Sequence, residues 1–252
     1  MKRATFKLAF LRHSDYQQTA HTPSALQHGA LTPLGVQQAQ AAAEELLDYA
    51  RKHHLTLHPE IDASQSLRAW QTAEVLRQTL NRLTHYSGHC IEYTALHERS
   101  VGSFANLSVT DIEACLQADP RVPHPPMHWK SDSDYRLPCP YAESLMEAGQ
   151  RVADHLTQTL NTLASSSDAH RLKLIVGHGA SFRHAAYHLG ALKREEIAQK
   201  SMHHARPLIF ECHLDDGHQV WSLCYGEWKT RSRTAAHTDK RLTDFTDTTL
   251  ID

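Results

Sequence analysis

Two short apolar runs, each closely followed by a histidine, constrain this chain of 252 residues more than any other feature. Phe6–Leu11 is separated from His13 by one arginine, and Leu172–Val176 is separated from His178 by one glycine. Apolar runs of this length between polar segments are typical of buried strands. Because an open α/β sheet binds its ligand at the carboxyl ends of its strands, we expect both histidines at that edge.

The rest of the chain predicts helices and strands in alternation, which is the pattern of an α/β fold. A helix is expected after Thr32-Pro33, because threonine can cap it, proline suits its first turn and apolar residues recur at helical spacing as far as Ala50. Further helices are expected at Arg68–Leu83, Val109–Gln117, Glu143–Leu163 and after Gly179, and further strands at 59–64, 91–95, 207–213 and 219–225.

Composition limits the classes of protein to which the chain can belong. The formal net charge is −2, so the chain has no basic excess for binding nucleic acid or an acidic membrane. Its five cysteines form no CxxC motif, which indicates neither a disulfide framework nor a thiolate metal site. No segment approaches the roughly 20 apolar residues of a membrane span, and none resembles a signal peptide. We therefore expect a soluble, cytoplasmic protein.

The length suits one large domain over residues 1–228, followed by a polar, threonine-rich tail over 229–252. Residues 99–140 differ from the rest, because six prolines between 119 and 140 exclude long regular elements. The same stretch carries Met127, Trp129 and Tyr135, which are unusual in a linker. We therefore interpret residues 99–140 as a cap inserted over the site.

Arginines and a glycine near the two histidines indicate a pocket for an anion. Arg12 offers a fixed fork of donors for phosphate oxygens, and Arg68 begins a predicted helix whose free N–H groups also favour an anion. Gly179 allows close approach of the backbone to a ligand. Glu98 follows a predicted strand and is a candidate general acid. Taken singly, each of these residues is more often a surface residue without a catalytic role.

Together these segments resemble the histidine phosphatase superfamily, the phosphoglycerate-mutase-like family, and they follow the order of that family's motifs. The matching segments are Arg12-His13, Leu31–Gly35 (LTPLG), Ser66–Ala73 (SLRAWQTA), Leu96–Gly102 (LHERSVG), Glu143–Leu145 (ESL), His178–Arg183 (HGASFR) and Pro207–Glu211 (PLIFE). The resemblance implies a three-layer α/β/α sandwich with a mostly parallel central sheet and an inserted cap segment. It also implies an enzyme that uses neither a metal nor a cofactor.

The function that the resemblance implies is hydrolysis of a phosphomonoester through a phosphohistidine on His13. Glu98 is then the general acid and base, while the two arginines and a protonated His178 balance the charge of the phosphoryl group. The full set of expected catalytic residues is His13, Glu98, His178, Arg12 and Arg68, and the expected substrate-binding residues are Ser14, Gln17, Gln18, Arg99, Gly179 and Glu143. The expected partner is a small phosphorylated substrate or a phosphoprotein, and a homodimer is also considered.

Departures from the family pattern weaken the case for phosphoglycerate as the substrate. Ser14 stands where the family has a glycine, and Ala180 replaces the asparagine after the second histidine. No asparagine follows Asp15-Tyr16, so a glutamine is expected in its place. The segment after Gly102 is also shorter than the substrate-covering insertion of the mutases.

Three alternatives to a phosphatase are considered. Phosphoryl transfer of the mutase type is the first. A non-catalytic scaffold is the second, and the retained His13, Arg68 and Glu98 argue against it. A metallohydrolase is the third, because His184 and His188 stand four residues apart on one predicted helix face. No glutamate stands beside His184 as in HExxH, and 21 histidines make one such pair expected by chance.

Overall fold

The first apolar run lies in the interior of the main sheet as β1 (Thr5–Arg12). A computed structural model describes residues 5–166, 168–215 and 218–231 of the chain. The other strands of this sheet are β2 (Thr56–Ser64), β3 (His89–Tyr93), β4 (Arg171–Gly177), β6 (Leu208–Asp215) and β7 (His218–Tyr225), in the order β3-β2-β4-β1-β6-β7. The first four strands of this order run parallel, and β6 and β7 are antiparallel additions at one edge. The predicted, mostly parallel sheet is confirmed.

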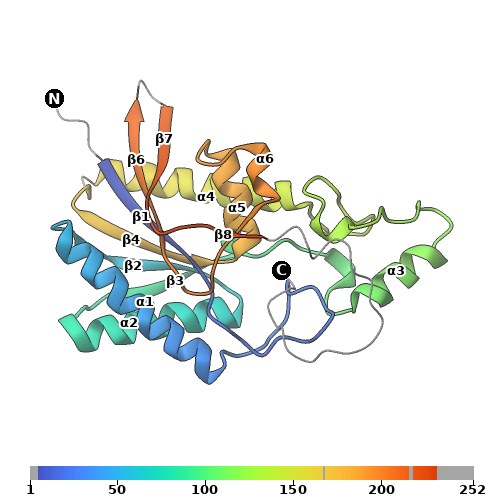
Figure 1. Ribbon diagram of the computed structural model, residues 1–252, viewed down its shortest axis with the longest axis horizontal. Helices are drawn as coiled ribbons and strands as arrows, with labels where there is room; N and C mark the ends of the chain where they lie inside the picture. The colour runs from blue at the N-terminus through green and yellow to red at the C-terminus, as the bar shows by residue number, and fades with distance from the viewer. Residues whose placement is uncertain (1–4, 167, 216–217, 232–252) are drawn as a thin grey trace.

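Helices cover both faces of the sheet, so the predicted three-layer sandwich is also confirmed (Figure 1). The helices that pack on the sheet are α1 (Pro33–Lys52), α2 (Leu67–Thr84), α4 (Leu145–Ser165) and α5 (Gly179–His188). The remaining elements are α3 (Val109–Ala118), α6 (Arg194–Ile197), β5 (Lys200–Ser201), β8 (Lys229–Thr230) and the 3-10 turns Thr94–Leu96, Gly102–Phe104 and Trp129–Ser131.

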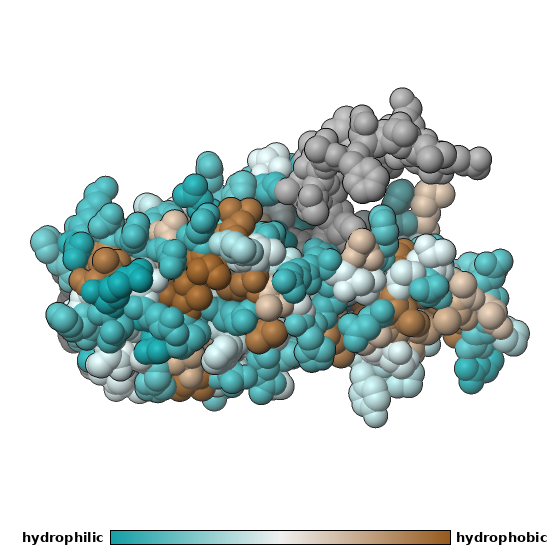
Figure 2. Space-filling model, turned by 90° about the horizontal axis from the view of Figure 1, so that it is seen from below, coloured by the Kyte–Doolittle hydropathy of each residue, from teal (hydrophilic) through white to brown (hydrophobic). Residues whose placement is uncertain are grey.

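Two apolar cores separate these layers, because alternate residues of a strand point to opposite faces. Leu11 and Ala9 of β1 pack with α1 and α2, whereas Phe10 and Leu8 pack with α4 and α5. Phe10 stacks on the ring of Phe182 in α5, with 5.2 Å between the ring centroids. From below, on the side of α1 and α2, the surface is largely hydrophilic with scattered apolar areas (Figure 2). Each of these four helices therefore buries one apolar face against the sheet.

Helices α1, α3 and α4 begin where the sequence supplies a side-chain cap. The Thr32 hydroxyl accepts the Gly35 N–H at the start of α1, as predicted, and Ser108 caps α3 in the same way. Helix α4 begins two residues later than expected, at Leu145. Ser144 caps it through a capping box, while the Glu143 side chain binds elsewhere. Satisfying the first N–H groups of a helix is worth about 1 kcal/mol per cap, which explains the sharp starts.

The predicted cap segment lies to one side of the sheet, and α3 is its longest helix (Figure 1). A small core of its own holds it together, built around Trp129, Ile112 and Leu116. Val101 and Ala142 form an isolated bridge where the segment leaves the domain and returns. Its prolines leave little regular structure between 119 and 140, as expected.

The predicted tail differs from expectation at its start. Lys229–Thr230 form β8, which pairs with Lys200–Ser201, and the Arg231 N–H donates to the carbonyl of Gln199. These residues therefore belong to the folded part of the protein, whereas residues 232–252 lie outside the described residues. Within the described ranges, no helix combines the length and apolar character needed to cross a membrane.

A buried ion pair joins the two neighbouring strands β2 and β4. The Lys173 ammonium lies 2.7 Å from Oδ1 of Asp62, and both side chains are almost fully buried. His155 of α4 contacts the other oxygen of Asp62 at 3.1 Å. Charges taken out of water are tolerated only when they are paired, so each partner depends on the other.

We predict that Asp62→Asn lowers the free energy of unfolding by about 3 kcal/mol, because the Lys173 charge stays buried without its main partner. The double variant Asp62→Asn/Lys173→Met should recover much of that loss. Denaturant unfolding measures both effects. Asp48→Asn removes an exposed pair with Arg51 and should change stability by less than about 1 kcal/mol. Equal stability of Asp62→Asn and the wild type would contradict the prediction.

Candidate active site

His13 lies directly beyond β1, and its backbone N–H donates to the carbonyl of Gly177 at the end of β4. Its side-chain Nδ1 lies 2.9 Å from the carbonyl oxygen of Ser14. A carbonyl only accepts, so Nδ1 carries the proton and Nε2 keeps its lone pair. Burial, followed by the charge of Arg68, holds the pKa of His13 well below its ordinary value. His13 is therefore a neutral imidazole with a nucleophilic Nε2.

His178 stands at the N-cap of α5, with its ring centroid 5.2 Å from that of His13. Nη2 of Arg68 lies 3.2 Å from its Nδ1. Because a guanidinium can only donate, this nitrogen holds a lone pair and Nε2 carries the proton, with the hydroxyls of Ser64 and Ser66 at 3.0 and 3.1 Å. Burial and the Arg68 charge lower the pKa of His178 well below its usual value. The expected protonated His178 is thus corrected to a neutral one in this arrangement.

Carbonyl oxygens fix the two arginines beside the histidines. Nη1 of Arg12 donates to the carbonyl of Met202 at 3.0 Å. Arg68 is fully buried, and it donates to the carbonyls of Ser24 and Gln27 at 2.9 and 3.1 Å. Held at these oxygens, both guanidinium groups are preorganised for an anion. Gly179 leaves room for Arg12, since a Cβ there would lie 3.0 Å from Cδ of Arg12, and its predicted role in substrate binding stays a prediction.

Glu98 follows the turn Thr94–Leu96, and two donors fix its Oε1. The hydroxyl of Ser181 in α5 donates to it at 2.8 Å, and the N–H of Arg99 at 2.9 Å. The same hydroxyl contacts the carbonyl of His97 at 3.1 Å. Ser181 therefore ties the Glu98 loop to α5, which begins directly after His178.

Glu143 supports this loop from behind, and among the described residues no hydrogen bond joins it to His13, His178, Arg12 or Arg68. Both of its oxygens pair with Arg151, at 2.8 and 2.7 Å. Arg151 in turn donates to the carbonyls of Ala95 and His97, at 2.8 and 3.1 Å. Burial alone would raise the pKa of Glu143, but the bonds and charge of Arg151 outweigh it and lower the pKa. Glu143 is therefore a positioning residue for the turn that carries Glu98.

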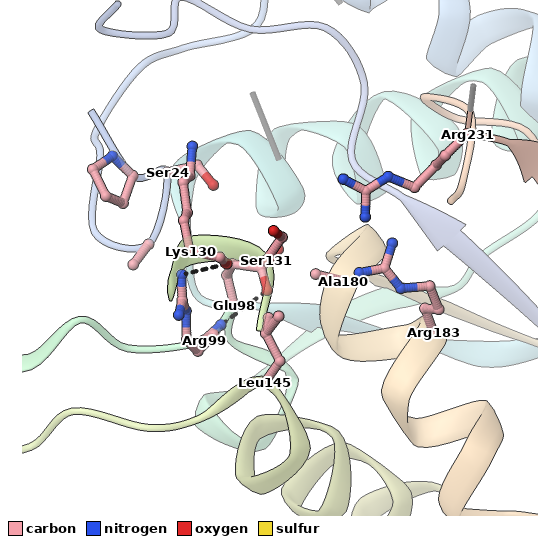
Figure 3. A pocket seen from close by; sticks show the side chains of 11 residues that line it. Ser24, Glu98, Arg99, Lys130, Ser131, Leu145, Ala180, Arg183 and Arg231 are labelled. Atoms are coloured by element: carbon pink, nitrogen blue, oxygen red, sulfur yellow. Dashed lines mark hydrogen bonds between the residues drawn. The ribbon is translucent and has the colours of Figure 1, made fainter. Parts of the chain in front are cut away.

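A small pocket opens beside Glu98 (Figure 3). Its lining residues are Pro23, Ser24, Ala25, Glu98, Arg99, Lys130, Ser131, Leu145, Ala180, Arg183 and Arg231. Arg99 lines it as predicted for a substrate-binding residue. Lys130 and Ser131 come from the cap segment, so this segment forms one wall of the pocket. The predicted cap is therefore in contact with the candidate site.

Three of the predicted substrate-binding residues lack a placement that indicates this role. Gln17 and Gln18 have exposed side chains. Ser14 is fully buried next to His13, and its N–H donates to the hydroxyl of Thr72 at 2.9 Å. Its own hydroxyl has no hydrogen-bond partner among the described residues. The role of these three side chains in substrate binding stays a prediction.

The histidine pair of the metal alternative is engaged in other bonds. Nδ1 of His184 contacts the carbonyl of Ala180, and its Nε2 contacts the hydroxyl of Ser133, at 2.8 and 3.0 Å. His188 contacts the carbonyl of Met146 at 3.0 Å. Within the described part of the chain, no three His, Cys, Asp or Glu side chains are grouped as metal ligands. Packing and hydrogen bonds therefore account for both histidines.

His204 is a site residue that sequence reasoning missed. Its ring centroid lies 5.4 Å from that of His13, and its Nδ1 lies 3.9 Å from an oxygen of Asp15. The neighbouring Ala205 N–H donates to the carbonyl of Arg12, which fixes this segment to β1. The sequence feature that could have indicated His204 is the His-His pair shortly before the PLIFE motif. Its distance from residue 13 in the sequence concealed the contact.

The sequence comparisons agree with this geometry. Residues 8–223 match the histidine phosphatase superfamily, branch 1, so the chain belongs to that superfamily and the predicted resemblance is confirmed. The 2,3-bisphosphoglycerate-dependent phosphoglycerate mutases of Rhizobium meliloti (strain 1021) and Rhizobium etli (strain CIAT 652) are 27% and 26% identical to it over 187 residues. The matches cover 73% of this chain and 79% of each relative.

Solved structures with this fold include a phosphatase and a mutase. The mycobacterial glucosyl-3-phosphoglycerate phosphatase superposes with a TM-score of 0.63 at 20% identity, covering 87% of this chain and 97% of its own. The phosphoglycerate mutase from Bacillus anthracis str. Sterne gives a TM-score of 0.63 at 16% identity, covering 88% of this chain and 92% of its own. Membership of a superfamily of phosphatases and mutases supports an enzyme, and the particular reaction is a separate question.

We predict a loss of stability in acid from the buried histidines. Burial lowers the pKa of His184 to about 3, whereas an unfolded histidine titrates near 6.5. The unfolded state therefore binds more protons below about pH 6.5, and stability falls with pH down to about 3. From pH 7 to 5, His184 alone should cost about 2 kcal/mol of unfolding free energy.

Denaturant unfolding at pH 7 and pH 5 tests this prediction. His184→Gln cannot be protonated, so its loss of stability on acidification should be smaller by about 2 kcal/mol. His124→Gln alters an exposed histidine and serves as the matched control, which should keep the wild-type pH dependence. An unchanged pH dependence in His184→Gln would show that another group causes the acid sensitivity.

Proposed function

We propose that this protein is a phosphatase that hydrolyses a phosphomonoester through a phosphohistidine on His13. The observation that carries the proposal is that His13, His178, Arg12 and Arg68 lie together at the ends of β1 and β4. Glu98 is bound to the first turn of α5, the helix that follows His178. This set combines a nucleophile, cationic donors and a carboxyl group that can exchange protons. Five free cysteines also support a reducing, cytoplasmic setting.

The first chemical step is in-line transfer of the phosphoryl group to His13. Nε2 attacks phosphorus, and the bond from phosphorus to the leaving oxygen breaks as the N–P bond forms. Glu98, protonated at this stage, gives its proton to the leaving oxygen, so that the product departs as an alcohol. The hydrogen bond from Nδ1 to the Ser14 carbonyl stabilises the positive charge that develops on the imidazole.

The second step returns the enzyme to its starting state. Glu98, now a carboxylate, removes a proton from water, and the water oxygen attacks phosphorus while the N–P bond breaks. Inorganic phosphate leaves, and His13 and Glu98 regain their initial protonation states. Throughout, Arg12 and Arg68 neutralise the equatorial oxygens from fixed positions. A bound phosphate dianion also raises the pKa of His178, because a nearby negative charge favours the imidazolium.

Transfer of the mutase type is the second candidate, and it is favoured by the names of the relatives at 26–27% identity. Two features of the chain support the phosphatase instead. Ala180 offers no side-chain amide beside His178, and Gln17 and Gln18, the nearest amides after His13, are exposed. With fewer amide donors to retain an intermediate, water is the more accessible acceptor.

We predict that His13→Ala abolishes both phosphoenzyme formation and turnover. Brief reaction of the wild type with a ³²P-labelled phosphomonoester, followed by quenching, should leave acid-labile and base-stable label on the protein. The label should then appear as inorganic phosphate, whereas a mutase would pass it to a second alcohol. Treatment with a chelator should leave the rate unchanged, since arginines supply the positive charge.

Label that survives in His13→Ala would exclude His13 as the nucleophile. Loss of activity on chelation and its recovery with zinc would instead support metal-dependent hydrolysis. His21→Ala is a suitable control, because His21 is an exposed histidine outside this group and should leave labelling intact.

We predict that Glu98→Gln slows phosphoenzyme formation far more with an alkyl phosphate than with p-nitrophenyl phosphate. An alkoxide needs a proton in order to leave, whereas p-nitrophenolate does not, and general acid help is worth about 10²–10⁴-fold. Single-turnover labelling isolates this step from the later attack by water. Glu92→Gln, an exposed carboxylate on β3, should leave both rates unchanged. Equal losses on both substrates would assign the leaving-group proton to another residue, with His97 or Asp15 next in line.

A further inference from the structure

His204 is a third imidazole at the nucleophile, and the proposed reaction gives it no role. Its ring centroid lies 5.4 Å from that of His13, and the two ring planes are inclined at 37°. The ring of Tyr16 meets His13 edge-on at 5.1 Å, and the ring of His178 lies at 5.2 Å. Three rings therefore enclose His13, which is only 2% exposed.

The main chain around His204 holds this approach in place. Arg12 and His204 form a parallel β-bridge, and the Ala205 N–H donates to the Arg12 carbonyl at 2.9 Å. Nη1 of Arg12 donates in turn to the carbonyl of Met202 at 3.0 Å. Ala205 is buried with a φ of +49°, a left-handed conformation that is unfavourable for alanine. Such a conformation persists only where the surrounding contacts impose it.

Asp15 gives His204 an acidic partner. Nδ1 of His204 lies 3.9 Å from one carboxylate oxygen of Asp15. The other oxygen accepts the Thr32 hydroxyl at 2.6 Å, which fixes the carboxylate at the start of α1. A neighbouring carboxylate favours the charged form of an imidazole. In the described part of the chain, no ion pair joins a carboxylate to His13 or His178, so His204 is the ring of the three that is suited to carry a proton.

His204 is also open to water, unlike the nucleophile. Its side chain is 25% exposed and lines an open groove between α1 and the segment 204–206. The carboxylates of that groove outnumber its lysine and arginine, which adds to the effect of Asp15, whereas Arg12, the bridge partner on β1, opposes it. Proton exchange at His204 therefore needs no opening of the site around His13. The titratable and charged residues of the groove besides His204 are Glu44, Glu45, Asp48, Tyr49, Lys52, His53, Arg206 and Tyr225.

We propose that His204 is a positioning residue for the nucleophile, which packs against the His13 ring and, paired with Asp15, holds a positive charge beside it. The charge opposes protonation of His13, so Nε2 stays free to attack phosphorus in mildly acidic solution. His204 acts through His13 and is given no contact with the substrate. The inference rests on the proposed role of His13 and adds a control of the pH range in which that role is available.

The charges that act on His13 agree with this role. Burial, followed by Arg68, His178, Arg12 and His204, lowers the pKa of His13. A bound phosphoryl dianion has the opposite effect, because a nearby negative charge favours the imidazolium. The added cation therefore matters most in the complex with substrate, where His13 is otherwise easiest to protonate.

His204→Phe tests the proposal, because it keeps a ring against His13 and removes the charge. Single-turnover phosphoenzyme formation from saturating p-nitrophenyl phosphate measures the effect, since this leaving group needs no proton. Near pH 8 histidine is ordinarily neutral, so the variant should react at close to the wild-type rate. At pH 5.5 the variant should be slower by about threefold or more, because His13 then protonates more readily. His203→Phe changes the neighbouring exposed histidine and should leave both rates unchanged.

Two outcomes of the rate measurement would overturn the proposal. One is an equal rate for His204→Phe and the wild type at both pH values. The other is an equal loss at both, because packing alone does not depend on pH. Asp15→Asn provides a second test if His204→Phe fails to fold, since asparagine still offers an oxygen to the Thr32 hydroxyl. In that variant His204 should take up its proton at a lower pH than in the wild type.

NMR titration of the imidazole nitrogens separates this proposal from the proposed function, because it needs no turnover. Inorganic sulfate, a dianion throughout the range, takes the place of the phosphoryl group. With sulfate bound, His13 should take up its proton at a higher pH in His204→Phe than in the wild type, and an unchanged titration of His13 would overturn the role of His204. A wild type that releases no phosphate would contradict the proposed function alone, and the titration still decides the role of His204.

Discussion

The parallel pairing of β1 with β4 is the constraint on which the rest of the site depends. Its register sets Arg12 opposite Gly177, and the bond from the His13 N–H to the Gly177 carbonyl extends the pairing by one step. His178 follows immediately, so two histidines more than 160 residues apart lie with their ring centroids 5.2 Å apart. A shift of this register by one residue would turn the β1 side chains to the opposite faces of the sheet and separate the two histidines.

The electrostatics of the centre follow from burying cations beside imidazoles. Arg68 is fully buried, and carbonyl oxygens rather than water solvate much of its guanidinium group. Burial, followed by the charge of Arg68, lowers the pKa of both His13 and His178 well below the ordinary value. This arrangement is expected to lower stability in acid, yet it provides an unprotonated imidazole at residue 13 and fixed donors for an anion. A phosphate ester would supply the negative charge that this positive environment favours.

Support for Glu98, the proposed general acid, comes from outside the group formed by His13, His178, Arg12 and Arg68. Ser181 anchors Glu98 to α5, while the Glu143–Arg151 pair binds the carbonyls of the preceding turn. The cap segment closes the other side, and Lys130 brings one of the pocket's cations from it. Residues from the sheet edge, from α4 and from the cap therefore meet around one carboxylate. Such support is what holds a catalytic group within the narrow tolerance that proton transfer requires.

The sequence by itself determined the strands of the main sheet, the helices that pack on it, the cap of α1 and the candidate site residues, because apolar periodicity and motif order are local properties. Thr32 as a cap and the histidines after two apolar runs are examples. Only the tertiary structure decided the neutral state of His178, the approach of His204 to His13 and the gathering of cations around Glu98. These features depend on contacts between distant segments and on the burial that those contacts create. Local sequence spacing predicts neither the contacts nor the burial.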